Sequence, residues 1–131
     1  MIDTGVLIVH ERKGALPDWS KYSSDEETCI SAVTLSELLV GAHLANTHQR
    51  RTERLNYVAT IAAILPILDF TADTARIHSG LRAHLRKAGL MIGAHDLIIA
   101  ASAVQHGHSV LTLNFGEFER VPGLTVIRWG G

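Results

Sequence analysis

Three acidic side chains lie within otherwise apolar segments, and any fold of this chain has to neutralise them. Asp3 adjoins Ile2, Glu37 precedes Leu38-Leu39-Val40, and Asp96 precedes Leu97-Ile98-Ile99-Ala100. An ionised carboxylate that is buried alone costs several kcal/mol or more, so it pairs with a cation, binds a metal or takes up a proton. Because no lysine or arginine neighbours any of the three in sequence, a bound metal ion is the economical prediction.

A fourth acid, Glu117, follows a predicted strand in the segment Asn114–Phe118. Any one of these acids alone is more often a helix cap or a buried hydrogen-bonding residue, but three in apolar segments form a pattern. Ligands that offer only oxygen favour Mg²⁺ or Mn²⁺ over zinc. Such a cluster binds one or two metal ions that orient water and neutralise a phosphodiester. The pattern therefore predicts a metal-dependent nuclease.

Other residues compete for a role in the site. Asp69 also ends a predicted strand, but an acid there is typical of a turn near the start of the next helix. His95 adjoins Asp96 and is within reach of a substrate phosphate, although a turn residue is the more common role. The lone Cys29 cannot form a cysteine-based zinc site or an internal disulfide, and we expect it in the core.

Short apolar runs alternate with longer helix-like stretches along the chain. The runs typical of strands end at Ile2 and cover Cys29–Val33, Ile67–Phe70, His108–Leu113 and Leu124–Trp129. The stretches typical of helices start at Thr34 or Ser36 and continue over Gln49–Ala63, Ala72–Lys87 and Asp96–Gln105, with Asn114–Phe118 as a turn. This alternation predicts an α/β fold with a mainly parallel central sheet of four to five strands and helices on both faces. The four acids fall at strand ends or helix starts, where such folds form their sites.

The composition fits one small intracellular domain. With 131 residues, 47% of them hydrophobic, the chain is long enough for one core, and we expect a single domain over residues 1–131. No apolar stretch approaches the roughly 20 residues of a membrane span, and the first residues lack the basic start of a signal peptide. We therefore expect a cytoplasmic protein. The net charge of −1 gives no global support for nucleic-acid binding, although Arg82 and Arg86 lie one helical turn apart.

Taken in order, these segments resemble the PIN-domain ribonucleases, and within them the VapC-type toxins of bacterial toxin–antitoxin pairs. The matching segments are Ile2–Ile8, Ile30–Leu38, Ile92–Ala100 and Leu111–Leu124. No single segment is specific, but the ordered set spans essentially the whole chain. Two positions differ from the family's pattern: Gly5 stands where Asn or Ser is common, and Glu117 stands where Asp is frequent.

The resemblance implies a PIN-like fold and an endoribonuclease that depends on Mg²⁺, with Mn²⁺ as a substitute. By resemblance, the catalytic and metal-binding acids are Asp3, Glu37, Asp96 and Glu117. The supporting polar residues are Thr4, Thr112 and Asn114, the last of which is also an alternative to Glu117 as the fourth ligand.

The resemblance also implies the partners of the chain. Its substrate would be a structured RNA, transfer or ribosomal, cut in an exposed single-stranded loop. A cognate VapB-type antitoxin would hold the enzyme inactive, and the chain would form a homodimer. Arg82 and Arg86 are candidates for steering the RNA backbone or for meeting the antitoxin.

Three alternatives are distinguished by individual residues. A haloacid-dehalogenase-type phosphatase would have a second aspartate two residues after Asp3, where Gly5 stands. A response-regulator receiver would have paired acids after the first strand and a late lysine, but no lysine follows Lys87. A catalytically silent PIN-like module that binds RNA or protein would lose site acids, whereas this chain keeps four.

Overall fold

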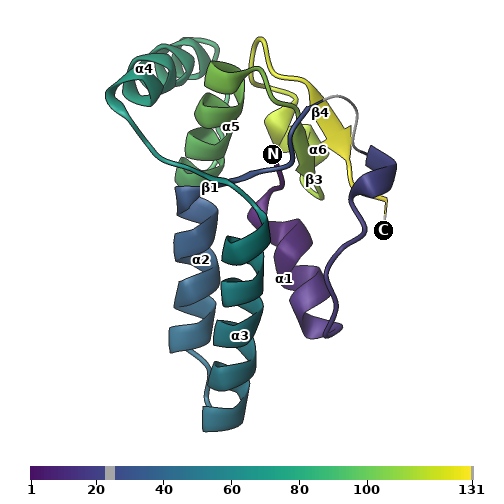
Figure 1. Ribbon diagram of the computed structural model, residues 1–131. Helices are drawn as coiled ribbons and strands as arrows, with labels where there is room; N and C mark the ends of the chain where they lie inside the picture. The colour runs from purple at the N-terminus through teal and green to yellow at the C-terminus, as the bar shows by residue number, and fades with distance from the viewer. Residues whose placement is uncertain (23–25, 131) are drawn as a thin grey trace.

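A computed structural model describes residues 1–22 and 26–130. The helices are α1 (Thr4–Arg12), a 3-10 turn (Ser20–Tyr22), α2 (Ala32–His43), α3 (His48–Ile64), α4 (Ala72–Lys87), α5 (Ala94–His106) and α6 (Phe115–Phe118). The strands are β1 (Ile30–Ser31), β2 (Ile67–Leu68), β3 (Val110–Thr112) and β4 (Val126–Arg128). Figure 1 shows α2 and α3 as a long hairpin that projects from the molecule, while α4 and α5 pack together beyond its opposite end.

The four short strands form two parallel pairs, β1 with β2 and β3 with β4. The segment Met1–Asp3 lies between the pairs. Ile2 N donates to Cys29 O on one side, and Asp3 N donates to Leu111 O on the other, both at 2.9 Å. The predicted α/β class with parallel strands is confirmed, whereas the continuous sheet of four to five strands is not. Strands of two or three residues are too short to show which runs pair.

Helix α4 covers the residues predicted for it because both of its ends carry strong local signals. The Thr71 hydroxyl accepts from Thr74 N, and the Thr74 hydroxyl accepts from Thr71 N, which completes a capping box. Gly89, just beyond the last turn, takes a φ of +70° that favours glycine.

Helix α2 begins earlier than predicted. Ser31, rather than Thr34 or Ser36, occupies the N-cap, and its hydroxyl accepts from Val33 N at 3.1 Å. Thr34 is therefore inside the helix and fully buried. The segment Asn114–Phe118, predicted as a turn, contains the one-turn helix α6.

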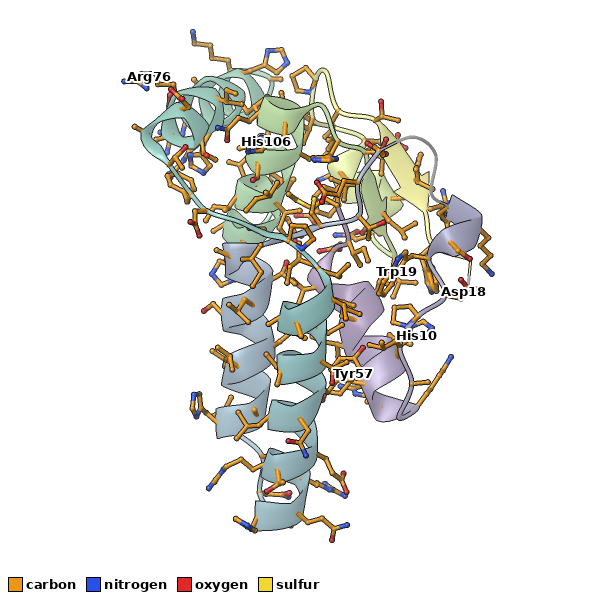
Figure 2. The ribbon with its side chains drawn as sticks, viewed as in Figure 1. His10, Asp18, Trp19, Tyr57, Arg76 and His106 are labelled. Atoms are coloured by element: carbon orange, nitrogen blue, oxygen red, sulfur yellow. The ribbon has the colours of Figure 1, made fainter. Side chains whose placement is uncertain are left out.

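The core holds the first turn of α1 in place. Helix α5 is largely buried, as its apolar sequence predicted, and Cys29 is buried as expected. Tyr57 points from α3 toward α1, as Figure 2 shows, and its hydroxyl donates to Leu7 O at 2.8 Å. Among the described residues, none of the helices is long and apolar enough to cross a membrane.

Candidate active site

The first carboxylate, Asp3, lies where the segment Met1–Asp3 turns into α1. It is 6% exposed, and the buried Thr112 hydroxyl on β3 donates to Asp3 Oδ2 at 2.7 Å. Burial raises the pKa of Asp3 above its ordinary value, hydrogen bonds from Thr112 and the Thr4 backbone lower it, and the charges of Glu37 and Glu117 raise it. Asp3 is thus a fixed acid whose negative charge is poorly compensated.

The second carboxylate, Glu37, projects from α2. The Thr4 hydroxyl donates to Glu37 Oε1 at 2.8 Å and lies 3.0 Å from the Thr34 hydroxyl. His95 Nδ1 lies 3.4 Å from Glu37 Oε2, and the His95 side chain is 58% exposed. Thr34 was expected only as a possible helix cap, yet it stands three residues before Glu37, on the same face of α2. That spacing is the sequence signal that could have revealed it.

The third carboxylate, Asp96, lies in the first turn of α5. Burial is the largest cause that raises the pKa of Asp96 to about 6, followed by the charges of Asp3, Glu117 and Glu37; a hydrogen bond from Asn114 lowers it. Like charges raise a carboxyl pKa only when they lie close by. The four predicted acids therefore meet in one region, although 114 residues separate Asp3 from Glu117 along the chain.

The fourth carboxylate, Glu117, is held on α6 by two uncharged donors. Gly93 N donates to Glu117 Oε1, and Asn114 Nδ2 donates to Glu117 Oε2. Asn114 N in turn donates to the Thr112 hydroxyl at 2.8 Å. A continuous polar network therefore links Asp3 to Glu117. Gly93 contributes through its backbone, a role that a sequence pattern does not reveal.

The remaining candidates lie elsewhere. Asp69 is exposed after β2, and it is not among the acids that act on Asp96. Arg82 and Arg86 are exposed on α4. Within residues 1–22 and 26–130, neither arginine forms an ion pair with the four acids, and neither does any lysine.

The spacing of the carboxylates also bears on metal binding. Over the described residues, no three His, Cys, Asp or Glu side chains are close enough to form a complete metal cage as they stand. The donors are oxygens, the kind of ligand that hard cations prefer, and two of the acids have raised pKa values. The donor chemistry thus fits Mg²⁺, and a bound cation would draw the carboxylates closer together than they lie here.

Comparisons with known proteins agree with this arrangement. The PIN domain family matches residues 1–124. Ribonuclease VapC1 of Rickettsia felis is 35% identical over 128 residues, which cover 97% of this chain and 93% of the relative. The tRNA(fMet)-specific endonuclease VapC of Salmonella typhimurium is 38% identical over 102 residues, 77% of this chain and 74% of the relative. Among solved structures, DNA-bound VapBC from Salmonella typhimurium aligns with a TM-score of 0.85 at 30% identity, over 98% of this chain and 96% of the other.

Proposed function

The chain belongs to the PIN domain family, and on that premise we propose that it is a Mg²⁺-dependent endoribonuclease toxin controlled by a VapB-type antitoxin. The ribonuclease activity follows from the family and from its VapC relatives. One observation in this chain carries the metal dependence: four carboxylates raise one another's pKa values without a lysine or arginine partner in the described chain.

Asp3, Glu37 and Asp96 are the proposed metal ligands, with Glu117 as the fourth acid. Mg²⁺, or Mn²⁺ in its place, would supply charge neutralisation at the phosphodiester and a water of lowered pKa. The site fits such an ion because its ligands are oxygens and its excess negative charge is expensive to keep uncompensated.

The polar side chains around the acids have the role of holding them in position. Thr112 orients Asp3, and Thr4 orients Glu37, each through one hydroxyl donor. Asn114 contacts Glu117 and also lowers the pKa of Asp96 through a hydrogen bond. Fixing the ligands in advance reduces the entropy lost when substrate and cation assemble.

The proposed substrate is a structured RNA cut in a single-stranded loop, either transfer or ribosomal RNA. Its support is the tRNA(fMet)-specific activity in the name of the Salmonella relative and the accessibility of bases and backbone in RNA loops. The proposed partners, an antitoxin and a second copy of the chain, rest on the toxin–antitoxin complexes among the similar structures. The proposed location is the cytoplasm, where these RNAs are found.

The test is incubation of antitoxin-free protein with total cellular RNA, with Mg²⁺, with Mn²⁺ and with a chelator, followed by mapping of RNA ends. We expect discrete cuts with either metal that disappear with the chelator and in Asp3→Ala. Folded protein that cuts nothing with any divalent metal would instead be a silent binding module.

A second prediction concerns the Thr112 hydroxyl. Thr112→Val keeps the side-chain volume but removes the donor to Asp3 and the acceptor for Asn114 N. We expect the affinity for Mg²⁺, or the cleavage rate at limiting Mg²⁺, to fall on the order of 10- to 100-fold. Thr112→Ser keeps the hydroxyl and is expected to restore most of the activity. Equal behaviour of Val and Ser in a Mg²⁺ titration would show that the hydroxyl does not orient the site.

A further inference from the structure

A cavity of about 640 Å³ lies between α4, α5 and the segment that joins them. Its apolar lining includes Leu85 from α4, Leu97 and Ile98 from α5, and Leu90 and Met91 from the joining segment. Leu90 is 41% exposed and Met91 is 80% exposed. The volume falls within the range of small-molecule binding sites, and apolar walls with a few polar groups are typical of such sites.

The titratable residues that line this cavity are all bases. They are His78, Arg82 and Arg86, all from α4. A neighbouring hollow on the same helix adds Lys87. Within the described residues, none of these four side chains forms an ion pair. The cavity therefore combines an apolar interior with uncompensated positive charge.

The cavity and the acidic site share one short strip of chain. Ile92 and Ala94 line the cavity, while Gly93 between them donates its N–H to Glu117. A Cβ on Gly93 would lie 3.5 Å from Asp96 Oδ2. Since consecutive Cα atoms are about 3.8 Å apart, a polynucleotide that crosses the acids needs to advance only about one residue's width of protein to reach the cavity.

We propose that this cavity takes an unstacked base of the RNA being cleaved, and that Arg82 and Arg86 bind the phosphates beside that base. The inference rests on the proposed function. Proteins that bind single-stranded RNA place bases in apolar or stacking pockets and lead the backbone along cations. The acidic site repels a phosphodiester until a cation is bound, so the adjoining basic cavity supplies the attraction that the acids do not.

A second copy of the chain is the competing occupant. In a two-fold symmetric contact the same patch faces itself, which would bring the bases on both copies of α4 together and would be repulsive. An RNA strand carries the opposite charge. Charge complementarity therefore favours RNA.

The experiment measures binding of a short fluorescein-labelled RNA that spans a mapped cut, by anisotropy with Ca²⁺ in place of Mg²⁺. We expect the variant with Arg82→Gln and Arg86→Gln to lose about 1.4 from the slope of log affinity against log salt, roughly 0.7 for each phosphate contact. Arg51→Gln, an exposed cation on α3, is the matched control and should keep the wild-type slope.

The base itself is tested by filling the cavity and by removing the base. Ala94→Phe, with circular dichroism to verify folding, should weaken binding on the order of tenfold; Leu90→Trp is a second filling variant. In wild type, moving one abasic nucleotide along the RNA should reveal a position with a similar loss. The two losses should not add, because they remove the same contact.

Three results would overturn the inference. Cleavage and binding by both filling variants at wild-type levels would remove the base pocket and leave the nuclease proposal intact. A filling variant with unchanged RNA affinity that turns from dimer to monomer in light scattering would assign the cavity to a second copy. If total RNA is not cut by wild type at all, the proposed function fails, and the inference fails with it.

Discussion

Asp96→Asn is expected to abolish RNA cleavage, with a loss in kcat of at least about a thousandfold, while the fold is retained. The substitution removes one negative charge from the acidic site at nearly constant volume. We expect Mg²⁺ no longer to raise the melting temperature of the variant, because a ligand stabilises only the state that binds it. Cleavage assays and thermal melts with and without Mg²⁺ measure both effects.

The stability of the same variant separates loss of chemistry from loss of fold. Burial and neighbouring charges raise the pKa of Asp96 to about 6, so folding favours its protonated form. The resulting stabilisation is fully present below the unfolded pKa and disappears as the pH rises through about 6. With chelator at pH 8, Asp96→Asn should therefore melt higher than wild type, and the difference should shrink toward pH 4.

Asp69→Asn is the matched control for Asp96→Asn. Asp69 is an exposed acid after a strand, so this variant should cut RNA like wild type. Wild-type cleavage by Asp96→Asn would refute the site assignment. Inactivity together with a lower melting temperature would indicate a folding defect.

Phe118→Ala is expected to destabilise the protein by about 3–5 kcal/mol, the range for truncation of a fully buried aromatic side chain. Phe118 is 0% exposed, and it anchors the one-turn helix α6 in the core beside Val121 and Leu97. A helix of four residues has little stability of its own. Urea denaturation measures the free energy of unfolding, and the same helix carries Glu117, so cleavage should also fall.

Phe115→Ala, in the same helix, is the matched control. Phe115 is half-buried, and the Arg128 guanidinium lies 4.5 Å from its ring centroid, a contact worth roughly 0.5–1 kcal/mol at an exposed site. Its truncation should cost clearly less than that of Phe118. Equal losses for the two variants would mean that α6 is not anchored through Phe118.

Local signals were sufficient to predict the helices but not the strand pairing. The limits of α4 were predicted from Thr71 and Gly89 because a cap and a positive-φ glycine act on adjacent residues. The joining of residues 1–3 to Leu111 and Cys29 depends on contacts across the whole chain, and no local pattern encodes it. The start of α2 was misplaced because Ser31, Thr34 and Ser36 are all suitable caps, and tertiary packing selected Ser31.

The acids themselves were predictable because a charge in an apolar segment conflicts with its surroundings. That conflict singled out Asp3, Glu37 and Asp96, and the structure brings these three together with Glu117. Their metal-binding and catalytic roles remain predictions. The groups that hold the acids were less visible: Thr34 resembled a cap, and the Gly93 amide belongs to no side chain. A threonine in a helix or a backbone N–H conflicts with nothing.

The bridge between Ile2 and Leu111 has a consequence for the time at which this protein becomes dangerous to its cell. During synthesis Asp3 is made first, but its neighbour Thr112 and the acid on α6 are among the last residues to be made. Pairing over such a separation is entropically expensive and forms late. A nascent chain is therefore harmless for nearly the whole of translation, and an incomplete one stays so. A partner that captures the finished chain has only to act after its own messenger has been read to the end.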